Sequence, residues 1–154
     1  MSRRYRATVI WTGDRGVGTS AYRADGREHR ILVEAKPELA GSADPAFLGD
    51  AERHNPEDLL VAALGACHML WYLQLAADAG IRVTAYEDAA EGVMTVNDDG
   101  GRFEAVTLNP VVTIAQGDAA RAEALHGAAH RRCFIANSVN FPVTHRPVIR
   151  AEPR

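Results

Sequence analysis

The chain of 154 residues is long enough for one domain, and its 47% of hydrophobic residues can fill a sizeable core. The formal net charge of -3 comes from charges of both signs scattered along the sequence, with no basic stripe that could follow a phosphate backbone. These features argue against nucleic-acid binding, and we expect no nucleic-acid partner.

The start of the chain and its cysteine content indicate the compartment. Arg3 and Arg4 are not followed by the apolar segment that a signal peptide requires. The two cysteines, Cys67 and Cys133, are too few for a secreted disulfide scaffold. We therefore expect a cytoplasmic protein whose thiols are reduced at rest and in which any disulfide between them is transient.

The N-terminal third shows strand and turn patterns. Residues 5–11 alternate in polarity, as a half-buried strand does. The Asp25-Gly26 pair predicts a hairpin turn between strands at residues 19–22 and 29–35. The pattern therefore predicts a three-stranded meander, and a polar loop leads from it to the next element.

A helix from residue 55 to residue 80 is the strongest local signal. Asn55 is a good N-cap, Pro56 suits the first helical position, and Gly80 closes the helix. Residues 59–77 carry no charge, but their Ala and Gly content, the polar His68 and the acidic flanks favour a buried core helix over a membrane span. A helix that is apolar all round needs cover on every side, which suggests a homodimer in which two such helices cover each other.

The segment after this helix predicts a second antiparallel strand pair. Residues 82–95 and 102–114 have strand composition and flank the turn sequence NDDGG. Asn109-Pro110 interrupts the second of these strands, and proline cannot donate a ladder hydrogen bond. We therefore expect a bend or bulge at this dipeptide.

The C-terminal segment predicts one more helix and one more strand. Asp118 is a good N-cap for a helix that reaches about residue 132, and residues 142–149 are expected to close as an edge strand. The element order is then βββ-α-ββ-α-β, which defines an α+β fold. We expect a single domain over residues 1–154.

Cys67 lies in the middle of the long apolar helix. It is about three turns inside, so the positive helix end is roughly 15 Å away and cannot activate the thiol. Apolar burial disfavours a thiolate, and a cysteine used as a small hydrophobic residue is the simplest role. A nucleophilic role requires a fixed cation nearby and a second cysteine within reach.

A zinc site is one alternative for the thiols. Cys67, His68, His130 and Cys133 have the residue types of a Cys₂His₂ site. Adjacent residues on a helix point about 100° apart, and HxxC without a partner CxxC is a poor match, so we expect no bound metal. The remaining histidines fit surface or strand positions and receive no functional role: His29, His54, His126 and His145.

Three segments carry a resemblance to a known family. They are TGDRG, which contains Arg15, NPEDLLVAALGACH, which contains Glu57 and Cys67, and AAHRRC, which ends at Cys133. With the predicted element order, they make the chain resemble the OsmC/Ohr superfamily of thiol-dependent organic hydroperoxide reductases, closer to the OsmC-like branch. NPE followed ten residues after its Glu by a cysteine is fairly specific, whereas GDRG alone would be weak.

The resemblance implies a fold and a reaction. The fold would have antiparallel sheets around a long buried central helix in an intertwined homodimer, with no bound cofactor. Cys67 would attack the peroxide and become a sulfenic acid, and Cys133 would resolve it as a disulfide. An external dithiol, commonly a lipoylated protein in this family, would reduce the disulfide. Arg15 would stabilise the Cys67 thiolate and the leaving oxygen, and Glu57 would orient Arg15.

Apolar residues around Cys67 suggest the kind of peroxide. A wall of Leu64, Leu70 and Trp71 would suit an alkyl or lipid hydroperoxide better than hydrogen peroxide. Phe134 follows Cys133 where relatives often have proline, so the resolving segment is expected to differ in shape. A non-catalytic dimeric module that binds an apolar ligand is the alternative from another functional class.

The spacing of Glu57 and Cys67 constrains how they share a site. Ten positions on one helix separate them by roughly 15 Å along the axis and about 80° around it. They cannot meet within one chain. An antiparallel pair of helices about a two-fold axis near residue 62 brings Glu57 of one protomer level with Cys67 of the other. We therefore expect each active site to use residues from both protomers.

Overall fold

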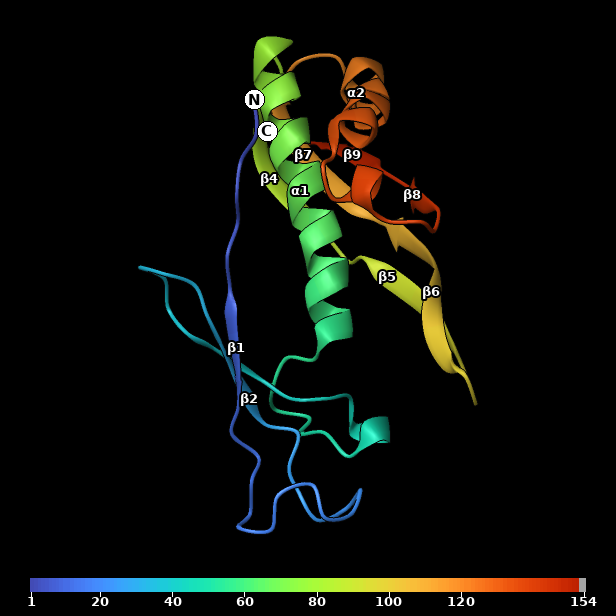
Figure 1. Ribbon diagram of the computed structural model, residues 1–154. Coiled ribbons are helices and arrows are strands. Elements are labelled where there is room, and N and C mark those ends of the chain that lie inside the picture. The colour runs from blue at the N-terminus through green and yellow to red at the C-terminus, as the bar shows by residue number, and fades with distance from the viewer. Residues whose placement is uncertain (153–154) are drawn as a thin grey trace. The chain divides into compact units, whose positions relative to one another are not determined.

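The computed structural model describes residues 1–152 (Figure 1). The chain divides into two compact units, Met1–Leu60 and Val61–Arg154. Two helices and three small sheets give the α+β class that the sequence predicts. The expectation of a single domain over residues 1–154 stays a prediction.

The first unit contains a three-stranded antiparallel sheet. Its strands are β1 (Thr8–Trp11), β2 (His29–Leu32) and β3 (Leu39–Gly41), in that order, followed by the short 3₁₀ helix η1 (Pro45–Phe47). β1 pairs directly with β2. The strand predicted at residues 19–22 is therefore wrong, and so is its hairpin, because residues 12–28 form an irregular loop of turns and bends.

Close backbone contact closes this loop at its base. The Gly26 N–H donates to the Gly13 carbonyl at 2.7 Å, and the Trp11 indole N–H donates to the Gly26 carbonyl at 2.9 Å. A Cβ atom on Gly13 would collide with the Gly26 carbonyl. The two glycines therefore bring the loop ends together without the strand ladder that the Asp25-Gly26 signal suggested.

The long helix α1 (Pro56–Asp78) begins and ends as predicted. The Asp58 N–H donates to Asn55 Oδ1 at 2.8 Å, which satisfies one of the free amides of the first turn. Pro56 occupies the first helical position, and Gly80 follows the helix with a φ of 71°. The first residues of α1 belong to the first unit and the rest to the second.

Within the second unit, α1 buries only one face. Buried residues recur at every fourth position: Leu64, His68, Tyr72 and Ala76. The exposed face of α1 has the same spacing and consists of Ala62, Ala66, Leu70 and Gln74. By length and composition, α1 is the one helix among residues 1–152 that could cross a membrane. The second unit by itself does not cover this helix on every side.

The second unit contains two three-stranded sheets. The first has the order β4 (Arg82–Asp88), β7 (Pro110–Gln116) and β9 (Val148–Ala151). The second has the order β5 (Glu91–Asn97), β6 (Gly100–Leu108) and β8 (Val143–His145). β4 with β7 and β5 with β6 are antiparallel, whereas β9 and β8 add as parallel strands.

Each strand predicted in this region is divided between the two sheets. Asn109-Pro110 separates β6 from β7, as the sequence predicts, and the other strand breaks between β4 and β5. The Asn109 N–H donates to Asp88 Oδ1 at 2.7 Å, and its side-chain amide donates to the Ala89 carbonyl at 2.9 Å. These hydrogen bonds hold the break between β6 and β7 next to the break between β4 and β5. The edge strand predicted at residues 142–149 is likewise two strands, one in each sheet.

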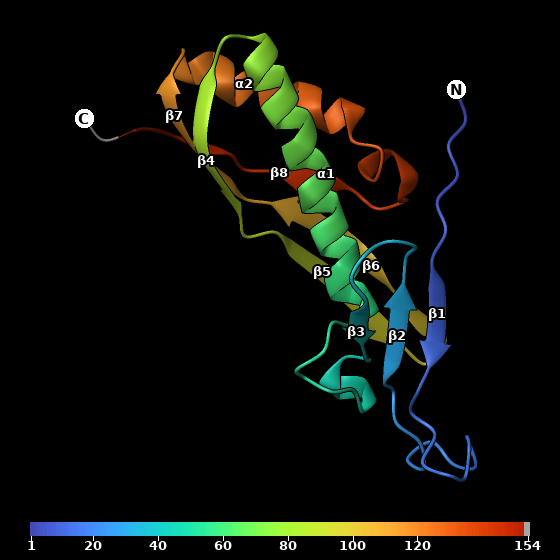
Figure 2. The same cartoon turned by 90° about the vertical axis from the view of Figure 1, so that its left-hand side faces the viewer.

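The second helix, α2 (Ala119–Arg132), packs with α1 on the sheet formed by β4, β7 and β9 (Figure 2). Asp118 caps it as predicted, accepting from the Arg121 N–H at 2.7 Å. The helix ends at Cys133, and the 3₁₀ helix η2 (Ala136–Ser138) follows. The core between α1, α2 and this sheet consists of Tyr72, Ala76, Ile81, Val112, Ile114, Ala122 and Ala129. A second core cluster consists of Leu64, Val106, Leu108 and Val143.

Candidate active site

The structure brings the two cysteines together in the second unit. Cys67 lies half-buried on α1, and Cys133 is 1% exposed at the C-terminal cap of α2; both are free thiols. The pKa of the Cys133 thiol is raised mainly by burial and in part by the Cys67 thiol beside it. Two helices that are distant in the sequence therefore present neighbouring sulfur atoms.

The backbone around Cys133 holds its side chain in place. The helix stops there because the residue is extended (φ -66°, ψ 110°), and its N–H still donates to the His130 carbonyl at 3.2 Å. The Ala136 N–H donates to Cys133 Sγ at 3.4 Å, which opposes part of the burial effect on the pKa. A buried thiol with a raised pKa is a poor first nucleophile for a peroxide. It is well placed to attack an oxidised neighbouring sulfur.

An exposed apolar surface lies beside the cysteines. Leu70 is 63% exposed and Phe134 is 66% exposed. The Trp71 ring meets the Phe134 ring edge to face, with centroids 5.4 Å apart, and the Arg132 guanidinium lies 5.6 Å from the Trp71 centroid. Trp71 comes one helical turn after Cys67, and Phe134 directly follows Cys133. The aromatic pair therefore lies next to both thiols.

Leu64 is not part of this surface. It is 0% exposed and packs with Val106, Leu108 and Val143 in the second core cluster. The expected wall of Leu64, Leu70 and Trp71 is therefore corrected to Leu70 and Trp71, because Leu64 lies on the face of α1 that meets the sheet of β5, β6 and β8.

Arg15 lies in a glycine-rich turn of the first unit. Asp14 Oδ1 accepts hydrogen bonds from the Gly18 and Gly16 amides at 2.9 and 2.8 Å. Both bonds lower the pKa of the Asp14 carboxyl, and the bond from Gly18 has the larger effect. Both glycines have positive φ, which suits them to such a turn. The Arg15 side chain is exposed and has no hydrogen bond or ion pair with any residue among 1–152. The turn fixes its backbone and leaves its guanidinium available.

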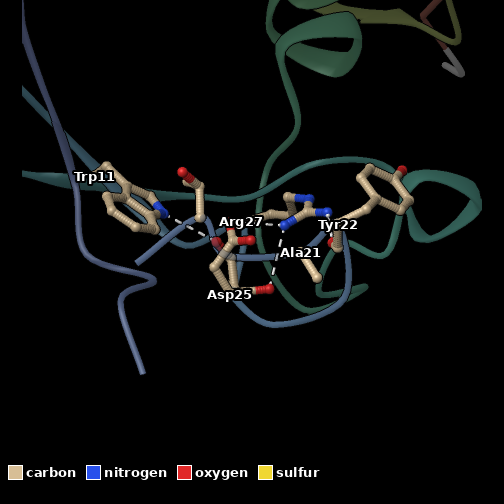
Figure 3. Close-up of a pocket in the computed structure, with 7 residues that line it drawn as sticks. Trp11, Ala21, Tyr22, Asp25 and Arg27 are labelled. Carbon is tan, nitrogen blue, oxygen red and sulfur yellow. Dashed lines mark hydrogen bonds and ion pairs between the residues drawn. The ribbon is translucent and has the colours of Figure 1, made fainter. Parts of the chain in front are cut away.

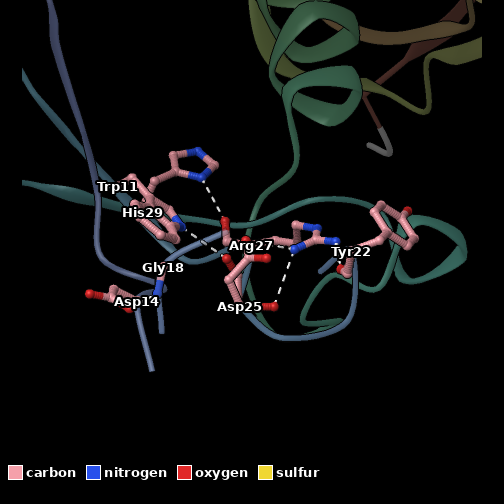
Figure 4. A network of polar contacts seen from close by, with 8 residues as sticks. Trp11, Asp14, Gly18, Tyr22, Asp25, Arg27 and His29 are labelled. Atoms are coloured by element: carbon pink, nitrogen blue, oxygen red, sulfur yellow. Dashed lines mark hydrogen bonds and ion pairs between the residues drawn. The ribbon is translucent and has the colours of Figure 1, made fainter. Parts of the chain in front are cut away.

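Arg27, which Figures 3 and 4 show in the same loop, already has side-chain partners. Arg27 forms an ion pair with Asp25 at 2.9 Å and lies 4.7 Å from the centroid of the Tyr22 ring. Together with Trp11 these residues line a pocket of about 350 Å³ (Figure 3). Arg27 therefore has a structural role in shaping the loop.

Glu57 lies in the first turn of α1, half-buried and without an ion-pair partner in the described part of the chain. The helix runs without a break through Cys67. The two residues are thus separated by roughly 15 Å along the helix axis. The unbroken helix keeps Glu57 and Cys67 apart, and a site shared between two protomers stays a prediction.

Sequence reasoning missed a cluster of imidazoles in the second unit. His68 and His126 are both 0% exposed, and their Nε2 and Nδ1 atoms lie 2.9 Å apart with ring planes within 9°. The His145 ring lies 5.6 Å from that of His68, and the His130 ring lies 5.8 Å from that of His145. The surface or strand position expected for His126 is wrong, because α2 buries it. The four-residue spacing of His126 and His130 on a predicted helix was the available signal.

Burial keeps the imidazoles of His68 and His126 uncharged at neutral pH. It lowers the pKa of His68 to about 4 and that of His126 to about 3, with neighbouring histidines adding to both effects. It also lowers the pKa of His145. Residues 1–152 contain no group of three His, Cys, Asp or Glu side chains arranged so that they could hold a metal ion. The zinc alternative therefore has no support from the geometry.

Comparisons with known proteins place this arrangement in context. The OsmC-like protein family matches residues 49–147. No curated protein matches the chain. An OsmC-like protein of unknown function from Vibrio cholerae is 30% identical, with a TM-score of 0.86 over 96% of this chain and 100% of that chain.

Two more distant structures show the same fold. An organic hydroperoxide resistance protein from Legionella pneumophila is 17% identical, with a TM-score of 0.67 over 96% of this chain and 97% of that one. An organic hydroperoxide resistance protein from Elizabethkingia anophelis is 18% identical, with a TM-score of 0.66 over 99% of this chain and 100% of that one. The predicted OsmC-like fold is therefore confirmed.

Proposed function

Because the chain belongs to the OsmC-like protein family, we propose that it protects against peroxide stress as a thiol-dependent peroxidase that reduces organic hydroperoxides to alcohols. The observation that carries the proposal is the pairing of Cys67 with Cys133 from two different helices. The reaction needs no bound cofactor, and reducing conditions in the cytoplasm would keep both thiols ready.

Cys67 is the proposed peroxide-reactive thiol because it is the more exposed of the two. Its thiolate attacks one oxygen of the hydroperoxide, and the O–O bond breaks. The alkoxide that leaves takes up a proton and departs as the alcohol, while Cys67 becomes a sulfenic acid. The peroxide gains the two electrons that the sulfur loses.

Cys133 is the proposed resolving residue. Its sulfur attacks Cys67 Sγ, the hydroxyl group leaves as water with the proton of the Cys133 thiol, and a disulfide forms. An external dithiol then reduces the disulfide by thiol exchange, and a lipoylated protein is the proposed partner. The burial of Cys133 supports this order of events, since it keeps the thiol protonated until the neighbouring sulfur is oxidised.

Arg15 and Glu57 are proposed to complete the site. The guanidinium of Arg15 would stabilise the Cys67 thiolate and the leaving oxygen, and Glu57 would orient it. Since Glu57 and Cys67 are far apart on one helix, we assign Glu57 to the site of the other protomer.

A homodimer is therefore part of the proposal. The exposed face of α1 is formed by small or apolar residues and one glutamine, and its small side chains allow a second helix to approach closely. Antiparallel packing of two copies about residue 62 would bury Ala62 and Ala66 and align each Glu57 with the other protomer's Cys67. Leu70 would lie level with a residue before the start of the other protomer's helix, and so would stay open beside Cys67.

Leu70, Trp71 and Phe134 define the proposed substrate class. Their exposed apolar surface beside the cysteines favours an alkyl or lipid hydroperoxide over hydrogen peroxide, which has no apolar group to bury. The same surface also suits the alternative, a non-catalytic module that binds an apolar ligand.

Steady-state peroxide consumption separates the two functions. Purified protein is supplied with dithiothreitol or dihydrolipoamide, and with cumene hydroperoxide, linoleate hydroperoxide or hydrogen peroxide. The proposal predicts rapid loss of the organic peroxides, slow loss of hydrogen peroxide, and no activity in Cys67→Ser. Wild-type rates equal to those of Cys67→Ser would leave only the binding module.

A further inference from the structure

One side-chain hydrogen bond joins the two helices that lead to the cysteines. His68 directly follows Cys67 on α1, and His126 lies two turns before Cys133 on α2. The contact between His68 Nε2 and His126 Nδ1, at 2.9 Å, is the one side-chain hydrogen bond between α1 and α2 within residues 1–152. A bond between these rings therefore acts close to both thiols.

Apart from the Arg132 guanidinium over the Trp71 ring, the rest of the helix contact is apolar, and on the α2 side its buried residues are small. Ala122 and Ala129 are 0% exposed and flank His126 on the buried face of α2. Apolar contact has no preferred direction, and small side chains interlock weakly. A hydrogen bond, by contrast, constrains both distance and angle. The histidine pair is therefore the buried directional contact that can fix how far α2 is shifted along α1.

The pair is also well protected. The Tyr72 ring stacks on His126 with centroids 4.0 Å apart, and neither histidine is accessible to solvent. A hydrogen bond in such surroundings does not compete with water and is strong. Because burial keeps both imidazoles neutral, one ring can donate while the other accepts.

We propose that the His68–His126 hydrogen bond positions Cys67 against Cys133 and so controls how fast and how stably their disulfide forms. The inference rests on the proposed cysteine cycle. A disulfide needs Cβ atoms about 3.5–4.5 Å apart and a defined dihedral angle, so a shift of about 1 Å between the helices is enough to hinder it. His68 and His126 are positioning residues, since neither takes part in the bond changes at sulfur.

The proposal concerns the resolution step alone. Cys133 Sγ bonds to Cys67 Sγ, the hydroxyl group of the Cys67 sulfenic acid leaves, and the proton of the Cys133 thiol joins it to form water. The earlier attack on peroxide requires only Cys67 and the groups around it. Breaking the histidine bond should therefore slow disulfide formation and leave sulfenic acid formation nearly unchanged.

A single-turnover experiment measures the two steps separately. Reduced protein receives one equivalent of cumene hydroperoxide, dimedone traps sulfenic acid, and mass spectrometry follows the disulfide after acid quenching. In His68→Leu we expect disulfide formation to slow about tenfold or more, with less than about threefold change in sulfenic acid formation. The disulfide of the variant should also be reduced by dithiothreitol at a correspondingly lower concentration.

Two variants provide rescue and control. In the double variant His68→Gln with His126→Asn, the amide groups occupy the positions of the bonded ring nitrogens, so a hydrogen bond and near wild-type resolution should return. Tyr72→Phe removes a buried hydroxyl that has no hydrogen-bond partner next to the same ring, and should leave both steps unchanged. Equal resolution rates in wild type, His68→Leu and the double variant would overturn the proposal.

The experiment also separates this inference from the proposed function. If cumene hydroperoxide does not oxidise wild-type Cys67, the peroxidase function fails, and diamide, which oxidises paired thiols directly, is used to compare disulfide formation in the same variants. Near-ultraviolet circular dichroism reports whether each variant folds. If His68→Leu does not fold, the comparison of His126→Leu with the double variant carries the test, and equal rates there contradict the proposal.

Discussion

The neutral state of His68 and His126 makes the stability of the fold depend on pH in one direction. The ordinary pKa of histidine is about 6.5, whereas burial lowers that of His68 to about 4 and that of His126 to about 3. Between these values the unfolded chain binds protons that the folded chain does not. The stabilisation is therefore complete above about pH 6.5 and is lost as the pH falls toward the folded-state pKa values.

The magnitude is large compared with the stability of a domain. Each pH unit below about 6.5 removes about 1.4 kcal/mol for each imidazole, so acidification to about pH 5 costs roughly 2 kcal/mol for each of the two. A typical domain is stable by only about 5–15 kcal/mol. Asp88 acts in the opposite sense, since burial raises the pKa of its carboxyl.

Urea unfolding at neutral and mildly acidic pH, at one protein concentration, tests this reasoning. Wild type should lose several kcal/mol between about pH 7 and pH 5, on the order given above. His68→Gln with His126→Asn cannot be protonated at these positions and should lose much less, whereas His54→Gln, at an exposed site, should behave as wild type. The reasoning is refuted if the double variant and wild type show the same dependence on pH.

Three further predictions test other parts of the structure. Arg15→Ala should lower the thiolate fraction of Cys67 and slow peroxide reduction about tenfold or more, and Arg15→Lys should restore the rate only partly. Identical thiolate absorbance in Arg15→Ala and wild type would refute the role of Arg15 in stabilising the thiolate. Leu64→Ala should lower the free energy of unfolding by about 2–5 kcal/mol in urea, because Leu64 is a core residue, and a loss confined to substrate binding would contradict its placement. A purified heterodimer of Cys67→Ser and Glu57→Ala chains should be more active than the mean of the two homodimers, since it regains one intact site, and activity at that mean would exclude a shared site.

The local elements were predictable because their signals lie within a few residues of each other. Asn55 and Asp118 cap the two helices as the sequence indicated, and Asn109-Pro110 divides a strand. The strand predicted at residues 19–22 failed because a contact between Gly13 and Gly26 closes that loop. Such backbone contacts between distant residues leave no periodic pattern in the sequence.

The sequence could not show which face of α1 is buried. The helix is apolar on all sides, so its periodicity does not distinguish Leu64, which lies in the core, from Leu70, which is exposed. The same ambiguity hid His68, whose position on the buried face matters only once α2 brings His126 opposite it. Cysteine pairing was accessible only through the family resemblance, because nothing in the local pattern links Cys67 to Cys133.

The central claim is that Cys67 meets the peroxide and Cys133 resolves it, and mass spectrometry after one equivalent of cumene hydroperoxide tests it most directly. Wild type should contain a Cys67–Cys133 disulfide, with one molecule of alcohol released for each disulfide. The Cys133→Ser protein should stop with a dimedone-reactive sulfenic acid on Cys67. An unmodified Cys67 thiol in Cys133→Ser, with the peroxide still present, would contradict the account.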